Sequence, residues 1–264
     1  MPRAARLRFA VVLFTLAAAL RCPKIEVLPT VLPRADIVVA ADGTGTCQTI
    51  REALSQAEPG NTILVRPGIY QEQVKFEKVG HITLLGLDPM TTVIDASYRY
   101  AGVEVLSDSN RISGLTVRNA DSHGIWVRDG HQTITGCLIV DNGERGIYLS
   151  AMAGNASARI SHCTIADNGE TGIYAARDSA GVVITDCIIA FNPRGIATDQ
   201  NTGRMTVQRN CLFNQSCNFD RVTPGDSNIM QDPKFLNREL GDYRLSKNSP
   251  CRKAGREGTN IGCF

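Results

Sequence analysis

The sequence of 264 residues carries little net charge, because 28 Lys and Arg residues nearly balance 26 Asp and Glu residues and leave a formal charge of +2. It also contains no long run of like charges, no low-complexity tract and no CxxC pair. The charge balance argues against a protein dedicated to nucleic acid or to an acidic partner. The absence of a CxxC pair argues against a metal site of that type.

Long apolar runs are scarce as well. The N-terminal run Phe9–Leu20 has 12 residues, which is too few to span a bilayer. Three arginines among the first eight residues precede this run, and three alanines at positions 17–19 offer a small-residue cleavage site. These features predict a signal peptide over residues 1–19, followed by a Pro-containing linker over residues 20–36. We therefore expect a secreted, periplasmic or cell-surface protein with no membrane span.

An internal repeat occupies the middle of the chain. "CLIVDNGERGIYLSA" (137–151) is followed by "CTIADNGETGIYAAR" (163–177), with related copies at 115–129 and 187–200 and a fading copy at 211–220. Each copy reads as a short apolar run, a turn with Asn or Asp and Gly, and a second short run that begins with "GI". A unit this small cannot bury its apolar face alone, so the copies must stack on one another.

Short strands that stack in parallel, two or three to a turn, predict an all-β fold. We expect a right-handed parallel β-helix of about seven rungs, with equivalent residues roughly 4.8 Å apart. β-Branched residues in the runs argue against helical repeats of similar length, and the spacing of leucine-rich repeats is absent. We assign residues 37–219 to the β-helix, with a short capping α-helix within residues 49–60. An irregular tail, residues 220–264, is expected to cover the far end of the coil.

Cysteines recur at one place in successive copies, separated by 26, 24 and 24 residues. The four residues are Cys137, Cys163, Cys187 and Cys211. Their phase is opposite to that of polar neighbours, so we predict that they point inward and stack in the core as small apolar side chains. Cys251 and Cys263 could form a disulfide that holds the tail. The pairing of the remaining cysteines stays open: Cys22, Cys47 and Cys217.

Asparagines and glycines also recur once per copy. Three asparagines share a turn position and predict an inward amide ladder that ties the turns together: Asn142, Asn168 and Asn192. Four glycines that precede an Ile are predicted to be turn residues with unusual φ values: Gly124, Gly146, Gly172 and Gly195.

The segment "VVAADGTGTCQTIREALSQAEPGNTILVRPGIYQEQV" (38–74) resembles the opening of pectin methylesterases and other pectin-lyase-like β-helix proteins. Residues 112–215 are similar to the β-helix repeats of bacterial secreted proteins. The tail, "DPKF…GDYRL…SP…AG…IG", is similar to the closing segment of the same class. The resemblance implies an exported right-handed β-helix that acts on, or binds, an acidic polysaccharide.

The motifs that carry chemistry in this class are incomplete in the sequence. The "DFIFG"-like motif of pectin methylesterases is not found after residue 74, and the polygalacturonase motifs are missing. "GIWVRDGH" (124–131) and "FNPRG" (191–195) match only parts of pectate-lyase motifs. "ADSHG" (120–124) resembles the "DPHD" motif of mannuronan epimerases at Asp121 and His123. That match makes the two residues candidates for general acid–base catalysis; the alternative is that both are ordinary surface residues.

Acidic residues pair across two adjacent copies. Stacking "DNGERG" on "DNGETG" places Asp141 beside Asp167 and Glu144 beside Glu170. Carboxylates this close are costly unless they are solvated, protonated or bridged by a cation, and their oxygens are ligands that Ca²⁺ prefers. These four residues are therefore candidate Ca²⁺ ligands, and in a lyase Arg145 would be the base that removes the C5 proton of a uronate. The alternative is a polar turn that faces water.

One aromatic residue follows "GI" in three consecutive copies: Trp126, Tyr148 and Tyr174. Strand alternation after an inward Ile favours an outward stripe, which could stack on sugar rings and bind substrate. An inward stripe would instead be an aromatic ladder in the core.

Two functions remain open from the sequence. The first is a carbohydrate-active enzyme, a lyase or epimerase that acts on a polyuronate with Ca²⁺ as its candidate cofactor. The second is a non-catalytic exported β-helix that binds glycans or a surface partner through the aromatic stripe.

Overall fold

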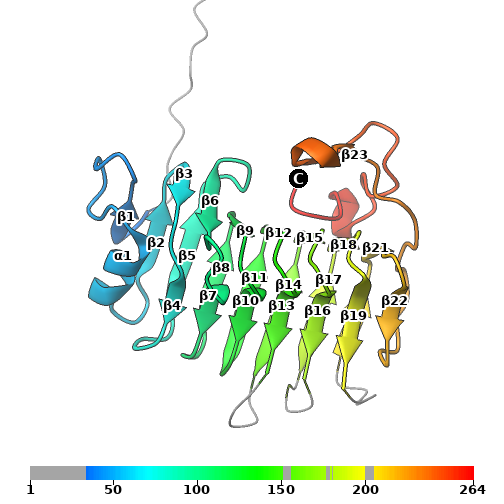
Figure 1. The fold of residues 1–264 in the computed structure, drawn as a ribbon, viewed down its shortest axis with the longest axis horizontal. Coiled ribbons are helices and arrows are strands. Elements are labelled where there is room, and N and C mark those ends of the chain that lie inside the picture. The colour runs from blue at the N-terminus through cyan, green and yellow to red at the C-terminus, as the bar shows by residue number, and fades with distance from the viewer. Residues whose placement is uncertain (1–33, 151–155, 177–178, 180, 200–204) are drawn as a thin grey trace, which may run out of the picture. The chain divides into compact units, whose positions relative to one another are not determined.

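The computed structural model describes residues 34–150, 156–176, 179, 181–199 and 205–264. Here the chain winds into a right-handed coil of about 7 turns, with three parallel sheets that run along its length (Figure 1). The predicted all-β coil and its N-terminal capping helix are confirmed. No helix in this part of the chain is long and apolar enough to cross a bilayer. The predicted signal peptide and most of the predicted linker lie outside the described residues.

Each rung contributes one strand to each sheet. Sheet A contains β1 (Ile37–Val39), β2 (Thr62–Val65), β5 (Thr83–Gly86), β8 (Arg111–Ser113), β11 (His131–Thr135), β14 (Ser157–Ser161), β17 (Val182–Thr185) and β20 (Met205–Gln208). Sheet B contains β3 (Gly68–Tyr70), β6 (Thr92–Asp95), β9 (Thr116–Arg118), β12 (Leu138–Val140), β15 (Thr164–Ala166), β18 (Ile188–Ala190) and β21 (Cys211–Phe213). Sheet C contains β4 (Val74–Phe76), β7 (Ala101–Val105), β10 (His123–Val127), β13 (Arg145–Leu149), β16 (Thr171–Ala175), β19 (Arg194–Thr198) and β22 (Cys217–Asp220).

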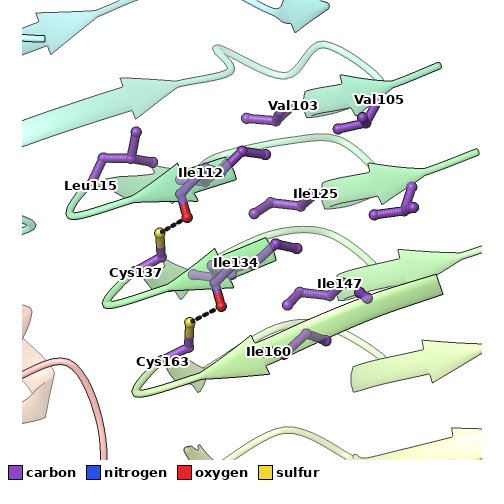
Figure 2. Close-up of a cluster of buried hydrophobic side chains, with 14 of the residues drawn as sticks. Val103, Val105, Ile112, Leu115, Ile125, Ile134, Cys137, Ile147, Ile160 and Cys163 are labelled. Carbon is purple, nitrogen blue, oxygen red and sulfur yellow. Dashed lines mark hydrogen bonds between the residues drawn. The ribbon is translucent and has the colours of Figure 1, made fainter. Parts of the chain in front are cut away.

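Inward apolar side chains form continuous columns through the coil. Ile112, Ile134 and Ile160 pair from rung to rung in sheet A, and Ile125 pairs with Ile147 in sheet C. All five are fully buried (Figure 2). Each such side chain stabilises the fold by roughly 1.5–3 kcal/mol, so the repeat that sets the register also supplies the core.

The predicted cysteine ladder holds for three of its four members. Cys137, Cys163 and Cys187 are fully buried, and the first two thiols donate to the carbonyl oxygens of the strand behind them (Figure 2). The prediction was wrong for Cys211. This residue pairs with Ile188 in the neighbouring rung, and Asn210 is the residue that stacks on Cys187. The last copy is one residue shorter than the cysteine spacing suggested, so Cys211 faces the tail instead of the coil interior.

The predicted amide ladder is confirmed and extends further than expected. The side chain of Asn142 donates to that of Asn168 at 2.9 Å, and Asn168 donates to Asn192 at 3.0 Å. Two more asparagines continue the ladder to the last rung: Asn214 and Asn218. Each amide also bonds backbone groups of its own turn, which satisfies polar groups that would otherwise be buried without partners.

The recurring glycines have a steric role, which corrects the prediction of unusual φ values. None of the four has a positive φ. A Cβ on Gly146 would lie 2.5 Å from the Ile165 side chain and 2.7 Å from the carbonyl oxygen of Gly172. The left-handed positions of these turns are instead Asp141 and Asp167, each with a φ of 55°. Glycine is therefore required because neighbouring rungs approach too closely for a side chain.

The N-terminal end of the coil is capped by α1 (Ile50–Gln56), which Figure 1 shows beside β4. The carboxylate of Glu72 accepts hydrogen bonds from the backbone N–H groups of Ile50 and Arg51, each at 2.9 Å. Thr49 caps the helix by accepting from the N–H of Glu52. An anionic side chain at the helix N-terminus satisfies free N–H groups and matches the helix dipole.

The C-terminal tail covers more of the coil than the sequence predicted. Its first part packs on the last rung, where Asn228 bonds Asn210. The rest folds back over the outer face of sheet B (Figure 1). This part contains η1 (Arg238–Leu240), η2 (Arg256–Gly258) and the antiparallel pair β23 (Phe235–Asn237) and β24 (Asp242–Leu245). The outer face of sheet B is apolar, so the tail covers it and not only the coil end.

The eight cysteines that the structure describes are free thiols. The disulfide considered between Cys251 and Cys263 is therefore not formed. Cys251 instead packs against Cys211, and Cys263 lies near Thr164 on the outer face of sheet B.

Candidate functional site

The three aromatic residues singled out in the sequence lie in register on the outer face of sheet C. Trp126 pairs with Tyr148, and Tyr148 pairs with Tyr174, on β10, β13 and β16. All three are half-buried, and they are called the aromatic stripe below. The ring centroids of Trp126 and Tyr148 are 6.0 Å apart with planes only 14° from parallel, and those of Tyr148 and Tyr174 are 5.8 Å apart.

Hydrogen bonds and guanidinium groups fix the orientation of the rings. The indole N–H of Trp126 donates to the Ser150 hydroxyl at 2.8 Å, and the Tyr174 hydroxyl donates to Asp199. Arg128 lies 4.5 Å from the Trp126 ring centroid, and Arg145 lies 4.8 Å from the centroids of both tyrosines. Burial and the Asp199 carboxylate raise the pKa of Tyr174 to about 12. The rings of the stripe are therefore held in place by hydrogen bonds and by cation–π contacts.

A ladder of alternating charges lies beside the aromatic stripe. Arg145 contacts Glu144 at 2.8 Å and Glu170 at 2.9 Å. Arg194, one rung further along, contacts Glu170 and also Asp220 at 3.0 Å. Toward the N-terminal end of the sheet, Glu104 binds Arg128 at 2.7 Å and Lys75 at 3.2 Å. Among the described residues, this ladder thus pairs four cations with four carboxylates, in addition to the Asp199 carboxylate at Tyr174.

His123 lies beneath the stripe with a side chain that is 1% exposed. Its ring packs edge-on against Tyr100, Trp126 and Tyr148, at centroid distances of 5.3, 5.7 and 4.7 Å. Burial, together with the positive charge of Arg145, lowers the pKa of His123 to about 4. The imidazole is therefore neutral near pH 7, and its Nδ1 has no hydrogen-bond partner among the described residues.

The structure brings most of the predicted site residues onto one surface. Arg145, Glu144 and Glu170 lie beside the aromatic stripe, and His123 is buried beneath it, with its Nδ1 3.7 Å from Glu144. Asp121 is exposed in the preceding turn, and its side chain has no hydrogen bond or ion pair to another described residue.

Asp141 and Asp167 lie elsewhere, under the C-terminal tail. Arg238 contacts the carboxylate of Asp167 at 2.6 Å, and the Tyr243 hydroxyl donates to it at 2.9 Å. These groups line a cleft of about 270 Å³. Partial burial, and then the neighbouring Asp167 carboxylate, raise the pKa of Asp141, and burial and Asp167 raise that of Tyr243.

The four acidic residues do not fit a single calcium site. Arginines already balance Glu144, Glu170 and Asp167, and the described residues contain no group of three or more His, Cys, Asp or Glu side chains suited to a metal ion. Calcium prefers six to eight oxygen ligands, which neither carboxylate pair supplies.

Several site residues were not expected from the sequence. Arg194 had a signal, because "RGI" at 194–196 repeats "RGI" at 145–147. No sequence signal pointed to the other four residues, because they reach the surface from other rungs and from irregular segments: Tyr100, Glu104, Arg128 and Asp220.

Two protein families match parts of the sequence. The family described as right-handed beta helix region matches residues 98–237, and the pectinesterase family matches residues 36–116. The second match contains the segment 38–74, on which the resemblance noted above was based.

Curated relatives match over part of the chain. It is 32% identical over 111 residues to a probable pectinesterase/pectinesterase inhibitor (number 58) of Arabidopsis thaliana, a match that covers 38% of this chain and 19% of the relative. It is 32% identical over 100 residues to pectinesterase 2 of Citrus sinensis, which covers 33% of this chain and 19% of the relative. The matched segments therefore span about a fifth of these relatives.

Solved structures share the fold. A pectin methylesterase from Aspergillus niger gives a TM-score of 0.54 at 16% identity, over 76% of this chain and 82% of that one. A mannuronic acid specific polysaccharide family 6 lyase from human gut microbiota gives 0.51 at 17% identity, over 64% and 48%. At these identities the likeness establishes a common architecture and no more.

Proposed function

The chain belongs to the right-handed β-helix family, and from this premise we propose that it is an exported protein that binds a polyuronate of the pectin type along the outer face of sheet C. The observation that carries the proposal is the aromatic stripe. The three half-buried rings lie in register, one per rung, with neighbouring centroids 5.8–6.0 Å apart. Aromatic side chains exposed in a row of this kind can stack on the apolar faces of sugar rings. Curated pectinesterases among the relatives support the substrate class.

The charge balance of this face favours one form of the polymer. Among the described residues of this face, four cations are paired with four carboxylates and Asp199 adds a further carboxylate, so there is no excess of positive charge to attract a fully ionised polyuronate. Methyl-esterified uronate units are neutral at the ester and can stack without displacing Glu144 or Glu170. We therefore expect highly esterified pectin to bind more tightly than polygalacturonate, with only weak dependence on salt.

The binding test uses Trp126→Ala and Tyr148→Ala, compared with the unmodified chain by affinity electrophoresis in gels that contain esterified pectin, polygalacturonate or alginate. Each variant should weaken retardation by esterified pectin at least about tenfold, because a central aromatic anchor is lost. Ile69→Ala is the matched control, since Ile69 is an exposed apolar residue on β3 in sheet B. Equal retardation of all variants would sink the proposal.

A second candidate function, ester or glycoside hydrolysis, is favoured by the cleft under the tail. Asp141 and Asp167 lie one rung apart, and their surroundings differ: Asp167 is held by Arg238 and Tyr243, whereas the pKa of Asp141 is raised. Two neighbouring carboxyl groups in different environments suit an acid and a nucleophile. Asp167→Asn should then abolish activity while Trp126→Ala only weakens binding.

The activity assay separates the possible reactions. Released methanol would indicate ester hydrolysis, and new reducing ends without ultraviolet absorbance would indicate glycoside hydrolysis. Unsaturated products that absorb in the ultraviolet would indicate elimination, the lyase reaction considered from the sequence. A change of uronate configuration without chain cleavage would indicate epimerisation, and parallel reactions with and without calcium test the cofactor. If none of these products is detected and the protein still binds pectin, binding without catalysis is the function.

A further inference from the structure

A pocket at the N-terminal end of the coil adjoins the charged surface of sheet C and shares Lys75 with it. It lies between α1 and β4 and has a volume of about 440 Å³. This volume falls in the range of small-molecule sites. β4 is the edge strand of sheet C, paired only with β7 in the described part of the chain. Figure 1 shows α1 and β4 side by side at this end of the coil.

The lining combines an apolar wall with cationic groups. Leu54 from α1, Phe76 from β4, and Val79 and Ile82 from the following turn form the apolar part. Leu54 and Val79 are only partly buried, so apolar surface remains open to a ligand. An apolar wall alone would bind many apolar ligands, so the charged groups around it determine which ligands the pocket prefers.

The cations of the pocket differ in how they are balanced. Lys75 lies 3.7 Å from Glu77 and 3.2 Å from Glu104, and its charge is therefore offset. Arg51 and Lys78 also line the pocket, and no ion pair in the described part of the chain engages either one. Two cations beside an apolar wall complement a ligand with one anionic group and an apolar body.

We infer that this pocket binds a small amphiphilic carboxylate, whose carboxyl group is held by Arg51 and Lys78 while its apolar body packs against Leu54 and Val79. A neutral ligand of the same shape would lose the two charge-assisted contacts. A cationic ligand would be repelled by the same two residues. The site thus selects by the sign of charge as well as by apolar surface.

The test uses the full chain and the fluorescent anion 8-anilinonaphthalene-1-sulfonate as a reporter of the apolar site. Three competitors with the same body are compared: 2-naphthylacetate, 2-naphthylethanol and 2-naphthylethylammonium. Saturable reporter binding is expected, with the carboxylate displacing it at concentrations about tenfold below those of the alcohol. The ammonium compound should be the weakest competitor.

Charge-reversal variants complete the test. Arg51→Glu and Lys78→Glu should each weaken the carboxylate about tenfold and change the alcohol little. Lys247→Glu is the control, because Lys247 is exposed in the tail and should leave all three competitors unchanged. Absence of saturable reporter binding, equal competition by the carboxylate and the alcohol, or carboxylate affinity unaffected by both reversals would each overturn the inference. None of these outcomes depends on pectin binding at sheet C.

Discussion

At the scale of single residues, His123 ties the stability of the fold to pH. Its side chain is buried among three aromatic rings, and its pKa is lowered to about 4 by burial and by Arg145. In an unfolded chain the same ring titrates near 6.5. Between these two pH values the unfolded chain binds a proton at His123 and the folded chain does not. The free energy of unfolding must therefore fall as the pH falls.

We predict that the folded protein loses about 3 kcal/mol through His123 as the pH drops from 7 to 4. The contribution is fully present above the unfolded pKa of about 6.5 and is lost progressively toward about 4. Urea unfolding of the unmodified chain and of His123→Gln at pH 7 and pH 4 measures it, because the variant cannot titrate. His131→Gln is the control, since His131 is exposed. Parallel pH profiles for the unmodified chain and His123→Gln would contradict the assignment.

At the scale of elements, the turns are joined by side chains and not only by strand pairing. Asn168 is 2% exposed, and its amide accepts from Asn142 while it donates to Asn192. It also donates to the carbonyl oxygens of Ile139 and Ala166, at 3.2 and 3.1 Å. Because these partners are buried as well, the loss of one amide leaves several polar groups unsatisfied at once.

We predict that Asn168→Ala destabilises the coil by about 3 kcal/mol. Urea-induced unfolding followed by circular dichroism is the measurement. Asn237→Ala is the matched control: Asn237 is exposed and its side chain caps no helix, so a change within about 0.5 kcal/mol is expected. A loss at Asn168 no larger than that at Asn237 would show that the ladder contributes nothing to stability.

The elements were predictable from the sequence where one local pattern recurs, and not where distant segments meet. The spacing of the "DNG" turns predicts the register that joins β12 to β15 and the amide ladder at Asn142. The prediction for Cys211 was wrong because cysteine is tolerated on either face of a strand. The regular cysteine spacing therefore did not reveal that the last copy is shifted by one residue relative to the copy before it. Arg238 binds Asp167 from 71 residues away, and no repeat pattern carries such a contact.

At the scale of the whole molecule, the C-terminal tail and the coil share an apolar interface over sheet B. Ile261 is fully buried there with Ile188 and Cys251. The backbone N–H of Gly262 donates to the carbonyl oxygen of Asp186 at 2.9 Å, which holds the end of the chain against the coil. Because few rung-to-rung contacts depend on the tail, we expect it to open locally without unwinding the rungs below it.

We predict that Ile261→Ser raises the rate of iodoacetamide modification at Cys251 and Cys211 at least about tenfold, because a polar substitution in this interface opens the tail locally. Modification is followed by mass spectrometry of each peptide, and far-ultraviolet circular dichroism should stay unchanged. Leu240→Ser is the control, since Leu240 is 82% exposed. Unchanged thiol reactivity in Ile261→Ser would mean that the tail is not held by this contact.

The column that contains Leu115, Cys137, Cys163 and Cys187 continues with Asn210, so its side chains change from apolar to polar where the coil meets its tail. The amide of Asn210 is fully buried and uses its donors on the carbonyl oxygens of Ile184 and Gln208. Asn228 then occupies the next level, where another rung would have to stack. An apolar side chain there would face an amide instead of a hydrocarbon surface. Because Asn210 and Asn228 match each other at this level, we expect an insertion of whole rungs to be tolerated more readily before Asn210 than between Asn210 and Asn228.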